Sequence, residues 1–270
     1  MHQTQQSIAS RQNFDALPRP PYSPPLLLGF LTLTARYLPE LVHRVGTPIA
    51  TGVFWAKATQ DRLGSIPGTG SLERAQAMLF LGFHRWTDLK GENGWHFIGL
   101  ATRYVQNLGY QKDENYQDAR KEERRGSDSE DELAERKEFI DREIRRRTFW
   151  SCFIMDRYTS CVSSRVQMIN VRDIKTQLPC SDGAFNRGTK VRTRWLGESD
   201  EQYSERRAAE TAKTRRVHHH ALWDNRSKKH GETHWEVGND EAALSLYIQT
   251  VDCFGEILAY SIGKGRRYVH

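Results

Sequence analysis

Apolar side chains recur every three or four positions along much of the chain, which is the spacing of one face of an α-helix. Ser71 is a suitable N-cap for the first clear stripe, and Gly91 and Gly94 are expected to end that helix. The stripe consists of Leu72, Ala75, Leu79, Phe83 and Trp86. A second helix is predicted from Trp95 to Leu108, and Gly109 takes the left-handed position that follows a helix. Its stripe consists of Ile98, Ala101, Val105 and Leu108.

Four further helices follow from the same spacing and from capping residues. We expect one over 26–37, disturbed at its end by Pro39, and one that Thr47 caps and that ends at Leu63. The buried face of this second helix is expected to hold Ile49, Val53 and Ala56. Another helix is predicted over 139–162. The last helix opens at Asp240, with a stripe formed by Leu244, Tyr247, Val251, Phe254 and Leu258. Alternation with a period of two is sustained nowhere, so the sequence predicts an all-α protein, an irregular helical bundle.

Three segments break the helical pattern. Residues 1–25 are rich in proline and glutamine, and we expect a disordered lead because proline disrupts helices. Residues 111–138 contain 18 charged residues, so they bury too little area to offset the entropy of ordering, and we interpret them as a charged insert. Residues 183–238 lack a stripe and are predicted to form a long, basic polar loop. The helical domain is expected over 26–267.

The charge and hydropathy of the chain disfavour two functions, nucleic-acid binding and membrane insertion. The chain has 40 Lys and Arg against 34 Asp and Glu, and its net charge of +6 equals the excess within 187–230, where 12 basic residues accompany 6 acidic ones. Few aromatic side chains interleave with these charges, so a solvated loop is favoured over a nucleic-acid-binding surface. No apolar run approaches the roughly 20 residues that span a bilayer. We therefore expect no membrane association.

No arrangement typical of catalysis is visible in the sequence. A phosphate-binding loop, a nucleophile elbow and a His-Glu-x-x-His motif are all absent from the printed chain. The cysteines lie far apart and are expected to be packed thiols: Cys152, Cys161, Cys180 and Cys253. His84 and Asp88 make only two ligands, and His218-His219-His220 lies in the predicted loop, so neither indicates a metal site. We expect no enzyme and no cofactor bound by this chain.

The most informative stretch runs from Glu143 to Tyr158, where an acidic residue interrupts an apolar face. Asp156 shares that face with Phe149 and Phe153. A buried carboxylate is costly unless it is paired, so we predict an arginine partner and favour an orienting ion pair over a catalytic group. The candidate partners are Arg165, Arg145, Arg146 and Arg147. Otherwise the arginine triplet is interpreted as a solvated helix face, with a weak likeness to a nuclear-import signal.

This stretch is similar to the signature of the fungal-specific transcription factor domain, the middle homology region of binuclear zinc-cluster regulators. The likeness rests on Arg-Arg-Arg-Thr-Phe-Trp-Ser-Cys-Phe-x-x-Asp-Arg-Tyr at 145–158, followed by Met168-Ile169, Asp173-Ile174 and Leu178-Pro179-Cys180. It extends over roughly 22–267. The positions to which the resemblance gives a structural role are Arg145, Arg146, Arg147, Trp150, Asp156, Arg157, Arg165, Asp173 and Pro179.

The resemblance implies the regulatory domain of a nuclear transcription factor, which controls transcription through a small-molecule effector or a protein partner. In complete members an N-terminal six-cysteine cluster holds zinc and reads DNA. The four cysteines of this sequence cannot form that cluster, so zinc and DNA contacts are expected only through a module not present in it. No DNA-binding residue is carried over.

Two departures from the family pattern affect what we expect. The family's Gly-Arg-Pro turn is here Ser164-Arg165-Val166, and the sequence stops after Gly265-Arg266-Arg267, where members usually continue. We therefore expect a domain truncated at its C-terminus, with an exposed apolar face that favours self-association. The alternative function is a structural or interaction protein that lacks DNA binding and titrates a full-length relative.

Overall fold

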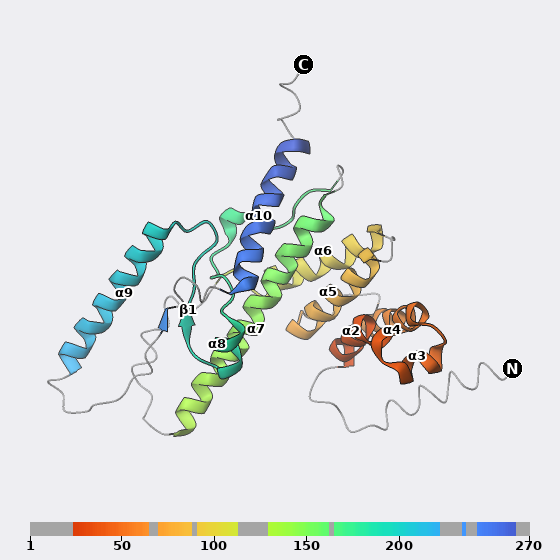
Figure 1. Cartoon of the computed structure of the whole chain (residues 1–270), viewed down its shortest axis with the longest axis horizontal. Coiled ribbons are helices and arrows are strands. Elements are labelled where there is room, and N and C mark those ends of the chain that lie inside the picture. The colour runs from red at the N-terminus through yellow and green to blue at the C-terminus, as the bar shows by residue number, and fades with distance from the viewer. Residues whose placement is uncertain are drawn as a thin grey trace, which may run out of the picture. The chain divides into compact units, whose positions relative to one another are not determined.

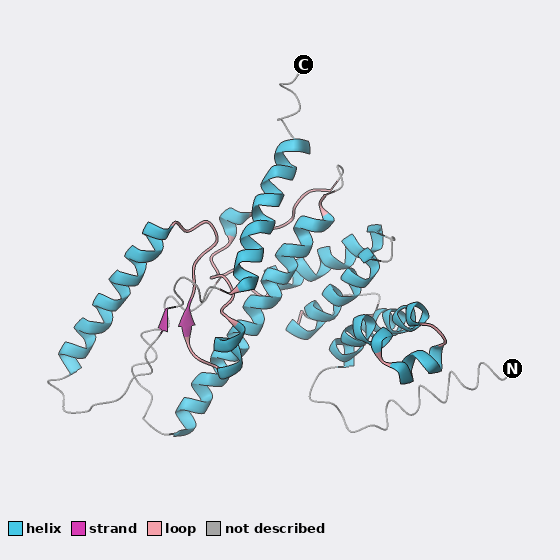
Figure 2. Ribbon diagram, in the orientation of Figure 1, coloured by secondary structure: helices cyan, strands magenta, loops and turns pink. Residues whose placement is uncertain are grey.

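The computed structural model describes seven stretches of the chain, which form two compact units. The described residues are 24–64, 70–87, 91–112, 129–161, 165–221, 234–235 and 242–262. The units divide between Phe97 and Ile98, inside helix α6 (Gly91–Asn107), and each is described by itself. Nearly all regular structure of the described residues is helical (Figure 2), so the predicted all-α class is confirmed. None of these helices is long and apolar enough to cross a membrane.

In the first unit, α2 packs against both α4 and α5. A Cβ on Gly29 would lie 3.0 Å from the Cα of Ala77, so glycine permits the close approach of α2 to α5. The hydroxyls of Thr32 and Thr59 are hydrogen-bonded at 2.9 Å in the α2–α4 contact. Small and neutral side chains therefore form part of both contacts of α2, with α5 and with α4. The elements of the unit are α2 (Pro24–Thr34), the 3₁₀ turn η1 (Ala35–Tyr37), α3 (Pro39–Val45), α4 (Pro48–Leu63), α5 (Leu72–Thr87) and the start of α6 (Figure 1).

Two prolines start helices that the sequence did not place correctly. Pro24 opens α2, two residues before the predicted start, and Pro39 opens α3 where we expected only a disturbed helix end. Proline is tolerated there because the first turn needs no hydrogen bond from its nitrogen. The remaining residues of the predicted lead, 1–23, lie outside the described residues.

The buried face of α4 differs from the predicted one. Thr47 caps the helix as predicted, since its hydroxyl accepts a hydrogen bond from the amide of Ala50. Ile49 is 72% exposed and Val53 is also exposed, so the predicted face is wrong except at Ala56. The buried residues are Thr51, Gly52, Trp55, Ala56, Thr59 and Leu63. Small residues and hydroxyls allow neighbouring helices to approach closely, which a count of large apolar residues does not detect.

Helices α5 and α6 follow the predicted pattern with two exceptions. The hydroxyl of Ser71 accepts from the amide of Arg74, which confirms the N-cap. Phe83 of the predicted stripe is exposed. Gly94 does not break the chain but lies within α6, where a Cβ would come within 2.7 Å of the amide nitrogen of Trp86. Glycine thus lets α6 pass closely beside the end of α5.

The second unit is built around α7 (Ser129–Thr159), with α10 (Ala243–Ile262) packed against it (Figure 1). Three predicted core residues of α6 are buried: Ile98, Ala101 and Val105. Gly109 has a φ of 77°, which confirms the predicted left-handed position. The unit's other elements are η5 (Val171–Asp173), α8 (Asp182–Arg187), α9 (Asp200–Ala221) and the parallel strands β1 (Val191–Arg192) and β2 (His234–Trp235).

Helix α7 is longer at its start than the sequence indicated. It begins ten residues before Phe139, so 129–138 of the predicted insert are helical, and the side chains of 133–138 are exposed. The helix ends at Thr159, three residues before the predicted end. Residues 113–128 of the insert lie outside the described residues.

The interpretation of 183–238 as a loop is wrong over α9, which has 22 residues, and over most of α8. Ser199 caps α9 by accepting a hydrogen bond from the amide of Gln202. Two acidic residues follow in the first turn, where their negative charges interact favourably with the helix dipole and stabilise the helix. The helix has no apolar stripe, so hydrophobic periodicity could not reveal it. Its buried Tyr203 instead packs under Arg194, whose guanidinium lies 4.5 Å from the ring centroid.

The buried face of α10 is also displaced from the predicted one. Its deepest residues are Ser245, Ile248, Val251 and Gly255. Of the predicted stripe, Val251 is buried as expected, whereas Tyr247 and Phe254 are exposed and meet Tyr158 at the edge of the contact with α7. The predicted cap, Asp240, lies outside the described residues.

Candidate functional site

Residues 165–180, which we call the arm, run back along α7 and are held at both ends by carboxylates of that helix. Asp156 binds the amide of Met168 at 3.0 Å, and Glu143 binds the amide of Cys180 at 2.9 Å. The two carboxyl residues are about 20 Å apart along a helix, whereas the arm between its two amides could extend to about 40 Å. The arm therefore has surplus length, part of which forms η5.

The residues directly before the second end of the arm are fixed by hydrogen bonds of their backbone groups. The indole nitrogen of Trp150, which is fully buried in α7, donates to the carbonyl of Gln177 at 2.7 Å. The hydroxyl of Ser245 in α10 donates to the carbonyl of Pro179 at 2.7 Å. The amide of Leu178 donates to the carbonyl of Arg194. Because buried backbone groups need partners, these contacts fix the path of the arm.

The first end of the arm is organised by Asp156, which is buried. Its carboxylate accepts from Nη1 of Arg157 at 2.9 Å and from the amides of Met168 and Ile169 at 3.0 Å. Arg157 also donates to the carbonyl of Ile169 at 2.9 Å and lies over the ring of Phe153. The predicted arginine pairing is confirmed, but the partner is none of the four candidates.

Burial shifts the pKa values of the ionisable groups at this end toward their neutral forms. Burial raises the pKa of Asp156, and the hydrogen bonds from Met168 and Ile169 followed by the charge of Arg157 offset part of that rise. Burial lowers the pKa of Arg157, which the charge of Asp156 opposes. Burial and the nearby Asp156 raise the pKa of the Cys152 thiol, so this sulfur stays protonated and is a poor nucleophile. The carboxylate is thus occupied in positioning the arm.

The second end is organised by Glu143, which the sequence analysis did not single out. Its carboxylate is fully buried and accepts from Arg146 at 2.6 Å and from Nε of Arg147 at 3.1 Å, besides the amide of Cys180. Arg147 extends to the carbonyl of Cys180 at 2.9 Å and to the exposed carboxylate of Asp182 at 2.8 Å. The spacing of three and four residues brings both arginines to the same helix side as the glutamate. That spacing is the sequence signal for this cluster, although it is equally common on exposed helices.

The three consecutive arginines have different environments. Arg145 is exposed, and its charge lowers the pKa of Tyr110 against a larger rise from burial. Arg146 is buried and Arg147 is partly buried. The interpretation of the triplet as a solvated face is therefore wrong for two of its members.

The remaining motif positions lie along the arm. Arg165 donates to the carbonyl of Thr159 at 3.2 Å, which satisfies a backbone group at the end of α7. Asp173 is exposed at the end of η5. The nine positions are thus not gathered in one cluster; most of them connect α7 to the arm.

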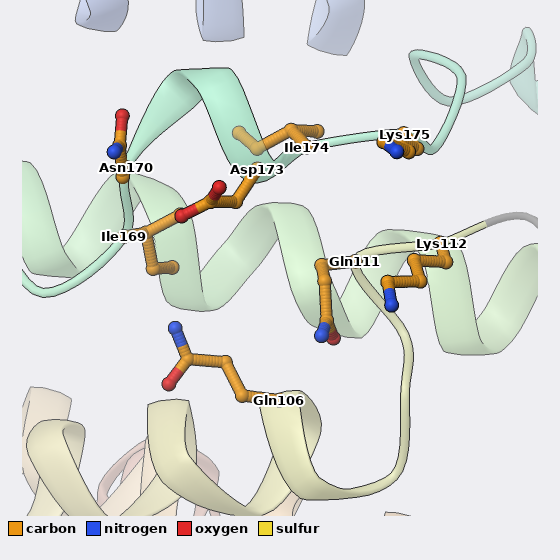
Figure 3. A pocket seen from close by; sticks show the side chains of 8 residues that line it. All are labelled: Gln106, Gln111, Lys112, Ile169, Asn170, Asp173, Ile174 and Lys175. Carbon is orange, nitrogen blue, oxygen red and sulfur yellow. The ribbon is translucent and has the colours of Figure 1, made fainter.

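A pocket of about 370 Å³ lies between the end of α6 and the arm, within the second unit. Figure 3 shows the side chains of Gln106, Gln111 and Ile169 extending into this space from opposite walls. Its volume lies in the range of small-molecule sites. The lining residues are Gln106, Gln111, Lys112, Ile169, Asn170, Asp173, Ile174 and Lys175. Of these residues, the sequence motif includes only Asp173 and its neighbours in the arm. The other polar residues come from two separate segments and form no local pattern.

The cysteines do not fit a binuclear zinc cluster. Cys152 and Cys180 are buried, whereas Cys161 and Cys253 are exposed, so the expectation of four packed thiols is wrong for two of them. Among the described residues, no group of three or more His, Cys, Asp or Glu side chains is placed to hold a metal ion.

These contacts define an all-helical domain in which buried charges hold a connecting arm beside a polar pocket. The chain belongs to the family described as "Fungal specific transcription factor domain", which matches residues 2–216. Its membership agrees with the resemblance at 145–158, and the family is one of transcription factors rather than enzymes. No solved structure matches the chain.

The similar curated proteins are transcriptional regulators of fungi. The chain is 30% identical over 174 residues to the Zn(2)-C6 fungal-type transcription factor FTF1c of Fusarium oxysporum f. sp. lycopersici, which covers 64% of this chain and 18% of that protein. It is 31% identical over 133 residues to the transcription factor tazR of Aspergillus terreus, covering 49% of this chain and 19% of that protein. An uncharacterized transcriptional regulatory protein of Schizosaccharomyces pombe is 28% identical over 159 residues, 57% of this chain and 15% of its own length. The chain thus spans less than a fifth of the length of these relatives.

Proposed function

We propose that this chain is a regulatory domain of a nuclear transcription factor, which changes transcription when a small effector or a protein partner alters the arm. Contact with DNA, and the zinc that supports it, belong in this proposal to a zinc-cluster module of the kind named in the Fusarium relatives. The domain itself performs no chemical step.

One observation carries the proposal: the segment that borders the pocket is the same segment that α7 holds by buried charges. Ile169 lines the pocket, and its amide binds Asp156. Any ligand that displaces Ile169 must therefore disturb a buried ion pair, and packed cores switch between discrete arrangements rather than deforming smoothly. Such a coupling would transmit a change in the pocket to other parts of the second unit.

The direct test is a reporter assay with the complete 270-residue chain fused to an unrelated DNA-binding domain. We expect the fusion to change reporter transcription severalfold relative to the DNA-binding domain alone. Substitution Asp156→Ala is expected to abolish that change, because the arm loses its first anchor.

The matched control is Asp141→Ala, which removes an exposed carboxylate from the same helix and is expected to leave reporter output unchanged. Immunoblots must show equal amounts of each fusion in the nucleus. The proposal is overturned when the fused chain, present at normal levels, has no effect on transcription.

A second candidate function is binding to a relative of the chain without any contact with DNA. It is favoured by the outer face of α10, where Leu246, Ile257 and Tyr260 are 52%, 67% and 72% exposed. These residues recur on one side of the helix, and exposed apolar stripes mark interaction surfaces. Light scattering would show a concentration-dependent dimer that Ile257→Glu abolishes. A monomer at all concentrations excludes the self-association on which this candidate depends.

A further inference from the structure

The pocket beside the arm is lined by charged side chains of both signs. Within the described part of the chain, no ion pair engages the side chains of Lys112, Lys175 or Asp173. The side-chain oxygen of Gln111 is buried and has no hydrogen-bond partner among the residues that the structure describes. A buried acceptor without a partner costs free energy, which a bound donor would recover.

The backbone brings the two lysines together. Lys112 and Lys175 are paired in an isolated parallel bridge, and the amide of Lys175 donates to the carbonyl of Gln111 at 2.7 Å. Figure 3 shows both lysines at one end of the pocket, whereas Asp173 lies toward the other end, near Ile169. Two ammonium groups at one end create a positive potential that favours an anion. The acceptors Asp173 and Gln111 favour a hydrogen-bond donor on the same ligand.

We propose that this pocket binds a small organic acid that also carries a hydrogen-bond donor, either the ammonium of an amino acid or the hydroxyl of a hydroxy acid. The carboxylate lies against the ammonium groups of Lys112 and Lys175. The donor group lies beside the side-chain oxygen of Gln111 at the lysine end, on the side that faces Asp173. This assignment rests on the proposed function, since it names the class of effector that the domain senses.

The geometry explains how a bound ligand would influence the rest of the second unit. Asp173 belongs to η5, and Ile169 lies four residues earlier in the arm, directly bonded to the Asp156 anchor. A ligand held between Gln111 and Asp173 therefore contacts the arm between its two anchors. No covalent step is involved.

The test is isothermal titration calorimetry of the complete chain with probes that share a carbon skeleton. Aspartate, malate and succinate differ only in carrying an ammonium, a hydroxyl or neither, and alanine, lactate and propionate form the matching monocarboxylate series. We expect at least one donor-bearing acid to bind tenfold more tightly than the plain acid of its series. Comparison of the ammonium and hydroxyl members then distinguishes the two classes of ligand.

Substitutions in the pocket test whether the acids bind there. Lys112→Gln and Lys175→Gln should each weaken all bound acids at least fivefold, because each removes one positive charge. Asp173→Ala, which removes the carboxylate acceptor, should reduce the preference for the donor-bearing acid while leaving binding of the plain acid unchanged or stronger. The matched control is Arg172→Gln, an exposed neighbour of Asp173 that does not line the pocket.

The assignment is overturned when none of the six acids binds at millimolar concentration, or when the donor-bearing and plain acids bind equally. Binding that the lysine variants leave unchanged also contradicts it. The binding experiment and the reporter assay test different claims. A reporter response without acid binding contradicts only the proposed class of ligand. Acid binding without a reporter response removes the proposed function and retains the site.

Discussion

The two ends of the arm are held by the same kind of group in different surroundings. Asp156 has buried partners, an adjacent arginine and two amides of the arm. Glu143 has two arginines, and one of them, Arg147, also reaches the exposed Asp182 at the surface. The two carboxylates differ in what their loss leaves behind: Arg157 stays buried with the carbonyl of Ile169, whereas Arg147 keeps a carboxylate at the surface.

The largest effect is expected at Asp156. The substitution Asp156→Ala leaves the charge of Arg157 buried without its partner and removes the acceptor of two amides, so it should lower the free energy of unfolding by about 3–5 kcal/mol. Chemical denaturation measures this loss. The control Asp141→Ala, exposed on the same helix, should change stability by less than about 0.5 kcal/mol. Equal stability of Asp156→Ala and the control would show that the pair contributes nothing.

A smaller effect is expected at Glu143. Glu143→Ala leaves Arg146 buried without this carboxylate but lets Arg147 keep Asp182 and the carbonyl of Cys180. It should therefore cost about 3 kcal/mol, at the lower end of the range for a broken buried ion pair. The same denaturation experiment ranks the two substitutions. A cost clearly above that of Asp156→Ala would refute the role given to Asp182. In Asp182→Ala, the exposed partner is gone, so Glu143→Ala should then become more damaging.

The neutral contact at Ser245 should matter less than either carboxylate. Ser245→Ala leaves the buried carbonyl of Pro179 without a donor and is expected to cost about 1–3 kcal/mol. The control is Thr250→Ala on the exposed side of α10, whose hydroxyl binds only within its own helix. Thermal melts of the two variants should differ clearly, and identical melting temperatures would count against a structural role of this hydrogen bond.

The smallest effect concerns pH at the edge of α10. The hydrogen bond with Tyr158 and then burial raise the pKa of Tyr247 to about 12 from its ordinary value of 10.0. The folded chain therefore keeps this proton where the unfolded chain loses it, so the contribution to stability is complete below pH 10 and falls as the pH rises toward 12. Ultraviolet titration of tyrosinate should show this late step, and Tyr247→Phe should remove it. Loss of the proton near its ordinary pKa would contradict the Tyr158–Tyr247 contact.

The helical class and several helix positions could be predicted because they depend on local spacing. The buried residues of α6 follow the stripe of Ile98, Ala101 and Val105, and Gly109 ends that helix in the predicted conformation. Prediction failed where no apolar stripe exists, as in α9, and where small or hydroxyl side chains form the contact, as in α4.

The candidate site was only partly visible in the sequence. The need for an arginine beside Asp156 follows from the cost of burying a charge, but the identity of the partner does not. Neighbouring side chains on a helix usually diverge, so helical spacing does not indicate Arg157 as the partner. The amides of Met168 and Ile169 complete the surroundings of Asp156, and the ring of Phe153 lies against Arg157. These contacts are long-range, as are those that form the pocket, and a single sequence does not report them.

The central claim is that α7 holds the two ends of the arm independently, and amide hydrogen exchange tests it most directly. In the unsubstituted chain the amides of Met168, Ile169 and Cys180 should exchange slowly, because each donates to a buried carboxylate. Asp156→Ala should accelerate exchange at Met168 and Ile169 and leave Cys180 protected, and Glu143→Ala should do the reverse. Rapid exchange of all three amides in the unsubstituted chain would contradict the account.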